Sequence, residues 1–290
     1  MVYGILRIIN FAHGDILMVG ALTTLSSLHL LNAGSPTLSP LLQLGIALLM
    51  AMAVCAALAM AVERFAYRRL RNAPRLAPLI SGIGVSVLLQ TIAMIIWTRN
   101  PLMFPQILPM DPITVTAGSP NHPPAIITVT GIITVALAIA VMLGLWLLVE
   151  FTRLGRGMRA VAENPRIASL MGVNPNAIIS LTFAIGGVFA ALAGVMMASN
   201  YGNAGFSMGF LPGIKAFTAA VLGGIGNIRG AMLGGILLGV IESLGASYLG
   251  ELTHGVFSSN YQDVFAFIVL ILVLLFRPAG ILGERVAHRA

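Results

Sequence analysis

Three long uncharged runs of apolar residues constrain this chain more than any other feature. Crossing roughly 30 Å of hydrocarbon as a helix takes about 20 residues, and each run is long enough: 41–62, 76–98 and 125–149. Only 9% of the residues are charged, whereas a water-soluble domain carries about a quarter. The runs also lack the alternation of apolar and polar residues that is typical of membrane β-strands. The sequence therefore predicts an all-α, polytopic membrane helix bundle.

The basic residues are gathered beside the apolar runs. Most of the 16 Lys and Arg fall in three short segments, 64–75, 153–166 and 277–289. Because cytoplasmic flanks of membrane helices carry an excess of basic residues, we expect all three segments, and with them the C-terminus, to face the cytoplasm. None is long enough to fold alone as a basic surface, so the net charge of +7 does not indicate nucleic-acid binding.

The three basic segments and the apolar runs between them predict a topology of about seven to eight transmembrane helices, some of them broken or half-spanning. The crossings alternate in direction, and the Pro-rich segment 100–124 lies outside. In chain order the predicted crossings are two within 16–62, then 76–98, 125–149, 176–199, 212–226, 230–249 and 264–276.

Small residues recur at helical spacing in the predicted membrane segments. Small residues four apart let helix backbones approach closely, which matters in lipid because apolar burial does not drive association there. We expect close helix packing at these positions, with a glycine-lined pore as the alternative. The positions are Gly226, Gly230, Gly234, Gly235 and Gly239, and earlier Gly186, Ala190, Gly194 and Ala198.

Motifs for catalysis, nucleotides and metals are missing or out of context. The sequence GRGMRA at 155–160 matches a dinucleotide-binding pattern but follows a membrane helix instead of a strand. The one lysine, Lys215, is followed by Ala216, which excludes a phosphate-binding loop ending in Lys-Ser or Lys-Thr. The five histidines show no metal-ligand spacing. We therefore predict that the chain is not an enzyme and that it has no catalytic residue, metal or cofactor. The single cysteine, Cys55, lies inside an apolar run, and we expect it either to face lipid or to fill space between helices.

Two charged residues fall inside a predicted membrane hairpin. Lys215 and Glu242 both lie about 16 to 18 Å above its cytoplasmic turn, at about 1.5 Å per helical residue. Charges at that depth are costly unless they are paired, and they are functional candidates by default. We expect an ion pair; the alternatives are a substrate or gating contact, or no contact at all.

The stretch INFAHGD places Asn10, His13 and Asp15 just ahead of an apolar run. Unwound backbone with polar side chains at membrane depth is tolerated only where protein or a water cavity satisfies it. The interpretations are a structural helix break, the lining of a path through the membrane, or a cytoplasmic interface contact.

A short polar segment, 153–176, interrupts the apolar runs on the predicted cytoplasmic side. Asn164 is a favourable N-cap, Pro165 suits the first helical position and Gly172 suits a left-handed stop. The sequence thus predicts a two-turn helix over 165–171. Its apolar side chains are flanked by arginines, and such a helix fits a groove on a partner protein. The alternative is a helix lying on the membrane surface.

Four motifs in order resemble one family of membrane proteins. They are INFAHGD, ENPRIASLMGVN, GIKAFTAAVLGGIGNIRGAMLGGILLGVIESL and FRPAGILG. Together they resemble the H-type permease subunits of the branched-chain amino acid (leucine, isoleucine, valine) ABC importers. The resemblance spans nearly all of the chain and implies a single transmembrane permease domain, 1–290, in the inner membrane. Members usually carry a further apolar helix ahead of the position of Met1, so we expect one upstream.

The resemblance also implies partners and site residues. The partners are a related M-type permease, two cytoplasmic ATPase subunits, a periplasmic amino acid binding protein and the substrate, which moves by alternating access. The implied contacts with the ATPase lie at Arg159, Glu163, Asn164, Pro165, Ile167, Ala168, Leu170, Met171 and Gly172. The candidates for the translocation path or for intramembrane polar contacts are Asn10, His13, Asp15, Lys215 and Glu242.

Three other functions remain open at this point. Related permeases for urea or short amides share the Asn-x-Ala-His-Gly type of motif. An ion-coupled secondary transporter would work alone and use an intramembrane acid such as Glu242. A purely structural membrane scaffold would transport nothing.

Overall fold

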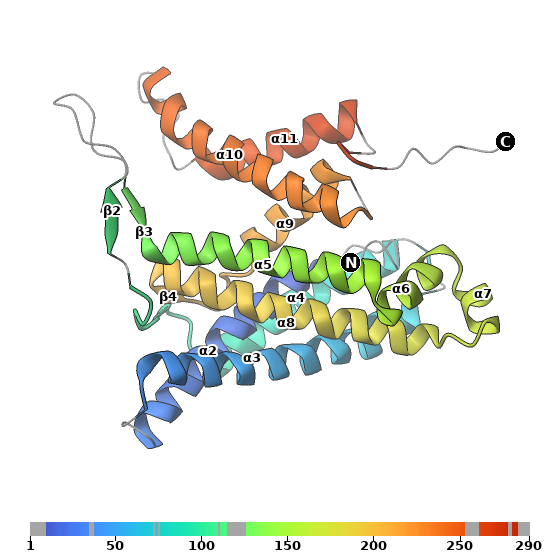
Figure 1. The fold of residues 1–290 in the computed structure, drawn as a ribbon, viewed down its shortest axis with the longest axis horizontal. Helices are drawn as coiled ribbons and strands as arrows, with labels where there is room; N and C mark the ends of the chain where they lie inside the picture. The colour runs from blue at the N-terminus through green and yellow to red at the C-terminus, as the bar shows by residue number, and fades with distance from the viewer. Residues whose placement is uncertain are drawn as a thin grey trace. The chain divides into compact units, whose positions relative to one another are not determined.

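The computed structural model describes residues 10–34, 38–71, 73–74, 76–109, 111–114, 126–224, 226–252, 261–277 and 280–283. They form two compact units, which divide between Phe210 and Leu211. Helices make up almost all of the regular structure in both units (Figure 1).

The first unit is a group of helices that ends at Phe210. Its α-helices are α2 (His13–Gly34), α3 (Pro40–Val62), α4 (Leu76–Ile96), α5 (Val129–Phe151), α6 (Arg153–Glu163), α7 (Pro165–Leu170) and α8 (Pro175–Tyr201). Helix α3 continues into a π-helical turn, η1 (Glu63–Tyr67), and a 3-10 turn, η2 (Arg68–Leu70). This continuation carries the chain directly into the first basic segment.

Two short antiparallel strand pairs accompany the helices of this unit. Strand β1 (Leu102–Met103) pairs with β4 (Asn203–Ala204), and β2 (Pro112–Thr114) pairs with β3 (Ile126–Thr128). Both pairs involve the predicted external segment, in which no strand was expected. The first pair joins that segment to the end of α8.

The second unit contains three described helices. They are α9, which starts at the boundary (Phe210–Gly223), α10 (Ile228–Leu252) and α11 (Gln262–Phe276). Ala219, Leu222 and Leu238 form its core, with Val269 and Val273 packed against them. The backbone N–H groups of Ile281 and Leu282 donate to the carbonyls of Leu222 and Gly223 at 2.9 and 3.0 Å. The C-terminal stretch thus satisfies the last carbonyls of α9, which would otherwise lack partners.

Within the described ranges, six helices are long and apolar enough to cross a membrane by length and composition. They are α2, α3 with its extension, α4, α5, α8 and α10. Helix α9 and the apolar part of α11 are shorter than a full crossing. The predicted polytopic all-α helix bundle is therefore confirmed.

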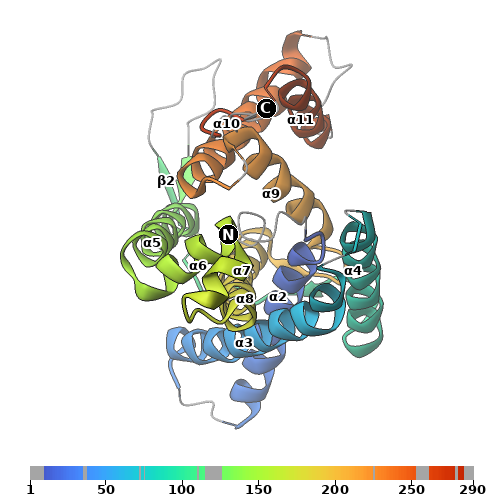
Figure 2. The same cartoon turned by 90° about the vertical axis from the view of Figure 1, so that its right-hand side faces the viewer.

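Helices α2, α3 and α8 pack together through small residues and lie side by side in Figures 1 and 2. A Cβ at Gly194 would overlap the backbone carbonyl of Leu17, and one at Gly187 would overlap that of Cys55. In the second unit, Gly223 and Gly230 abut in the same way. Close packing is thus confirmed at Gly194 and Gly230, whereas Gly239 borders open space.

Cys55 fills space between these helices. Its side chain is fully buried, and Sγ lies 3.4 Å from the carbonyl oxygen of Ile16. Of the two predicted placements, packing filler is correct and a lipid-facing position is wrong.

Candidate functional site

Helix α7 is a discrete two-turn helix held by a cap at each end. Oδ1 of Asn164 accepts hydrogen bonds from the backbone N–H groups of Arg166 and Ile167, at 3.0 and 3.2 Å. Pro165 occupies the first turn, and Gly172 follows the helix with a φ of 83°. Both predicted caps are confirmed, and the helix ends at Leu170, one residue before the predicted end.

The apolar side chains of α7 point away from the rest of the unit. Ile167, Leu170 and Met171 are 58%, 86% and 79% exposed, whereas Ala168 is buried. Large apolar side chains that are exposed close together often mark a site of interaction with another molecule. The α7 face, defined as Ile167, Leu170 and Met171, is therefore a candidate contact surface.

Helix α6 supports α7 and was not predicted as a helix. Its Met158 and Val161 are buried, and a Cβ at Gly157 would lie 2.8 Å from Cδ1 of Ile178 at the start of α8. Arg159 turns back to α5, where its guanidinium donates to the carbonyls of Val149 and Glu150. Glu163, the last residue of α6, is exposed.

A shallow groove of about 540 Å³ lies between α6 and the start of α8. Its lining combines two arginines with mainly small and apolar residues. They are Arg153, Arg156, Gly157, Ala160, Val173, Asn174, Ala177 and Ile178.

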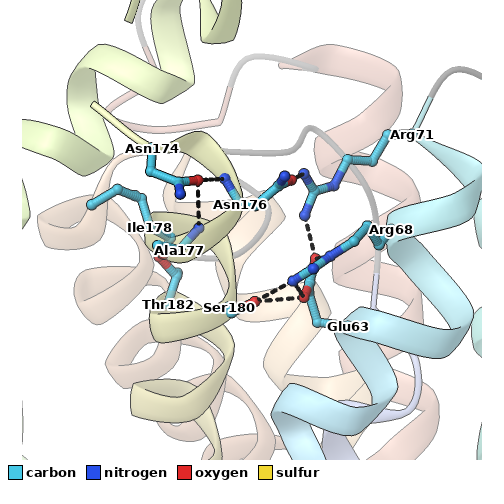
Figure 3. Close-up of polar contacts among 9 residues, drawn as sticks. All are labelled: Glu63, Arg68, Arg71, Asn174, Asn176, Ala177, Ile178, Ser180 and Thr182. Carbon is cyan, nitrogen blue, oxygen red and sulfur yellow. Dashed lines mark hydrogen bonds and ion pairs between the residues drawn. The ribbon is translucent and has the colours of Figure 1, made fainter. Parts of the chain in front are cut away.

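A buried polar cluster stands on the other side of the start of α8 (Figure 3). Glu63 at the end of α3 is fully buried and accepts hydrogen bonds from Arg68, Arg71 and Ser180. Arg71 also donates to Asn176. We call Glu63, Arg68, Arg71, Asn176 and Ser180 the Glu63 cluster. This cluster was not predicted, because its arginines belong to a basic segment that was expected to be exposed to solvent.

The predicted pair in the second unit is present and has a third member. Nζ of Lys215 lies 3.0 Å from Oε2 of Glu242 and 2.6 Å from Oδ1 of Asp263. The contact between Lys215 and Glu242 is thus confirmed. Asp263 was missed because the predicted final crossing began one residue after it.

The polar residues near the N-terminus have different partners within the first unit. Helix α2 begins at His13, so only residues 10–12 of the predicted unwound stretch precede it. Asp15 is fully buried in the first turn, where Nε2 of Gln90 donates to its Oδ1 at 2.9 Å. Oδ1 of Asn10 accepts from the hydroxyl of Tyr67 at 3.0 Å.

In the part of the chain that the structure describes, no group of His, Cys, Asp or Glu could hold a metal ion.

Comparison with known proteins identifies the family. A family model described as "Branched-chain amino acid transport system / permease component" matches residues 1–274. The chain belongs to this permease family. Its members are transport subunits and not enzymes, as expected.

Two curated relatives cover almost the whole permease. It is 45% identical over 284 residues to the high-affinity branched-chain amino acid transport system permease protein BraD of Pseudomonas aeruginosa. It is 41% identical over 285 residues to the corresponding protein LivH of Escherichia coli K12. These alignments cover 98% of this chain and 89% and 88% of the two relatives. No solved structure gives a significant match to this permease.

Proposed function

We propose that this permease is the membrane-spanning subunit of an ATP-driven importer that moves branched-chain amino acids across the inner membrane by alternating access. The family description and the names of the relatives support this substrate class. They do not fit the urea, short-amide or ion-coupled alternatives. Both compact units then belong to one transmembrane permease domain, with a cytoplasmic C-terminus.

The observation that carries the ATP-driven part of the proposal is the exposed α7 face. Leu170 and Met171 are 86% and 79% exposed on a helix whose two ends are fixed. Because both ends are fixed, the helix already has the conformation that a partner would bind, and docking loses little conformational entropy. A helix with exposed apolar anchors docks into a groove on a partner, and here the partner is a cytoplasmic ATPase subunit.

The remaining coupling residues support α7 or flank it. Asn164, Pro165, Ala168 and Gly172 hold its shape, whereas Ile167, Leu170 and Met171 make the contact. Arg159 and Glu163 belong to α6, beside the groove. The full importer contains this chain, an M-type permease, two ATPase subunits and a periplasmic binding protein that delivers the substrate.

The polar residues of the membrane segments are the candidates for the translocation path. Buried polar side chains at membrane depth are expensive and are commonly kept for function. The candidates are Asn10, His13, Asp15, Lys215 and Glu242; Asp15 is fully buried and the other four are partly buried.

Reconstitution tests the function directly. The permease, its M-type partner and the ATPase subunits are placed in proteoliposomes with internal ATP, and uptake of labelled leucine is measured with external binding protein present. We expect uptake that requires both ATP and the ATPase subunits and that is insensitive to ionophores. Leucine uptake that persists without the ATPase subunits and collapses when the ion gradient is dissipated would contradict the proposal.

A further inference from the structure

Glu63 is an acidic residue buried where helix α3 passes into its π-helical extension. Its side chain is fully buried. Nε of Arg68 donates to Oε1 at 3.2 Å, and Nη2 of Arg68 donates to Oε2 at 2.7 Å. The hydroxyl of Ser180 donates to Oε2 at 2.6 Å, and Arg71 donates to Oε1. Both carboxylate oxygens are thus held by two donors each.

The same arginines reach the first turns of α8. Nη1 of Arg71 donates to Oδ1 of Asn176 at 2.6 Å, and Nη2 of Arg68 donates to Oγ of Ser180 at 2.7 Å. Asn176 and Ser180 are four residues apart, so they lie on one face of the helix. Figure 3 shows this face turned toward Glu63 and the two arginines. The cluster therefore joins the end of α3 to the start of α8.

The π-helical turn η1 also touches α2 and α8 through Tyr67. This tyrosine is fully buried, its hydroxyl donates to Asn10 ahead of α2, and its ring lies 5.7 Å from that of Phe183 in α8. π-helical turns inside α-helices are frequent at functional sites. At this turn the ends of three packed helices are held together.

The position of the cluster along the chain connects it to α7. Asn176 follows Gly172, the stop of α7, by only four residues, and the short link between them is fixed. Oδ1 of Asn174 accepts hydrogen bonds from the backbone N–H groups of Asn176 and Ala177, at 3.0 and 3.2 Å. A displacement of α7 thus reaches the start of α8 with little slack.

Stability alone does not account for a buried carboxylate at this place. Burying an ion pair often stabilises a protein no better than apolar packing of the same volume, because desolvation offsets the attraction. The two-pronged Arg68 contact with Glu63 instead fixes direction as well as distance. If one helix is to move another, the contact between them has to keep its geometry during the movement, and directional hydrogen bonds provide this.

We propose that Glu63 is a positioning residue for ATP-driven coupling. It locks the start of α8 to the end of α3, so that a push received by the α7 face moves α2, α3 and α8 as one body. This inference rests on the proposed function. Without the Glu63 contacts, α7 still docks and the ATPase still turns over, but the movement is lost at the start of α8.

The test measures leucine uptake and ATP hydrolysis in the same proteoliposomes. In Glu63→Gln we expect the ATPase subunits to remain bound and ATP hydrolysis to continue, while leucine taken up per ATP falls about tenfold, a typical size for coupling between two sites. Asp111→Asn is the control, since Asp111 is an exposed acid in the predicted external segment and does not belong to the coupling residues. The control should keep the wild-type ratio.

A second pair of variants covers the case in which Glu63→Gln does not fold. Asn176→Ala removes an exposed contact of Arg71 without leaving a buried charge, and we expect a smaller fall in uptake per ATP. Asn176→Asp keeps an acceptor for Arg71 and should restore the ratio. A wild-type ratio in Glu63→Gln overturns the inference, and where that variant does not fold, a wild-type ratio in Asn176→Ala overturns it. A parallel loss of uptake and hydrolysis overturns it too. If the wild-type complex shows no ATP-dependent uptake, the proposed function itself fails, and this inference falls with it.

Discussion

The ammonium group of Lys215 lies 2.6 Å from Oδ1 of Asp263, closer than the 3.0 Å that separate it from Glu242. The three side chains come from α9, α11 and α10, so this triad joins all the described helices of the second unit. One cation faces two carboxylates, and Oε1 of Glu242 is buried with no hydrogen-bond partner among the described residues. Lys215 therefore holds two acids that have no other cation beside them in the described part of the unit.

Replacing Lys215 by Met should destabilise the second unit. The substitution removes the cation that both carboxylates contact, and an unpaired charge in a membrane segment is costly. We expect a loss of about 2 kcal/mol, less than for a fully buried pair, because the side chains are partly exposed. Thermal unfolding of the detergent-solubilised protein measures this loss.

A neutral triad provides the control for that prediction. Lys215→Met combined with Glu242→Gln and Asp263→Asn removes the unpaired charges, and stability should return toward that of the wild type. A triple variant no more stable than Lys215→Met would show that charge is not the cause.

Adding one methyl group at Gly194 should disrupt the packing of α2 against α8. A Cβ there overlaps the carbonyl of Leu17, and overpacking of this kind costs typically 1–3 kcal/mol. Gly144→Ala in α5 is the matched control, because nothing lies within 4 Å of its Cβ position. We expect Gly194→Ala to lower the unfolding temperature and Gly144→Ala to leave it unchanged or raise it. Equal effects of the two substitutions would refute close packing at Gly194.

Removing the N-cap of α7 should weaken docking without unfolding the permease. Asn164→Ala deletes the acceptor for two backbone N–H groups, which costs about 1 kcal/mol of local helix stability. We expect the affinity for the ATPase subunit to fall about fivefold, as that free energy implies. Asn164→Asp keeps a capping oxygen and should bind as the wild type does. Titration of the purified ATPase against the reconstituted permease measures both; unchanged affinity in Asn164→Ala would contradict the role of the cap.

Local patterns predicted much of this fold. Uncharged runs located the long helices to within a few residues, because about 20 apolar residues are what a bilayer requires. Asn164 and Gly172 marked the ends of α7 through backbone chemistry that acts over two or three residues. The contact between Lys215 and Glu242 followed from helix rise alone, since a short turn joins their helices.

Contacts between distant segments could not be predicted in this way. Glu63 is separated from Ser180 by 117 residues, and Arg71 from Asn176 by 105. Neither pair has a periodicity or motif that links its members. Helix α6 was not predicted, because its two glycines and three arginines leave too few apolar residues for a clear helical pattern. Its buried apolar side chains are Met158 and Val161. The β1–β4 pair joins Leu102 to Ala204, two positions far apart in the chain, which no local pattern encodes.

A double substitution on the α7 face tests whether this face connects the permease to an ATPase subunit. Leu170→Asp with Met171→Asp makes this face acidic while leaving Asn164, Ala168 and Gly172 in place. Leu170→Met with Met171→Leu is the matched control, because it keeps the face apolar.

Both proteins are purified from membranes with the ATPase subunits, and leucine uptake is measured after reconstitution. We expect the acidic variant to insert and fold but to lose the ATPase subunits and ATP-dependent uptake, while the control keeps both. Normal ATPase co-purification and normal uptake in the acidic variant would show that the α7 face does not bind the ATPase.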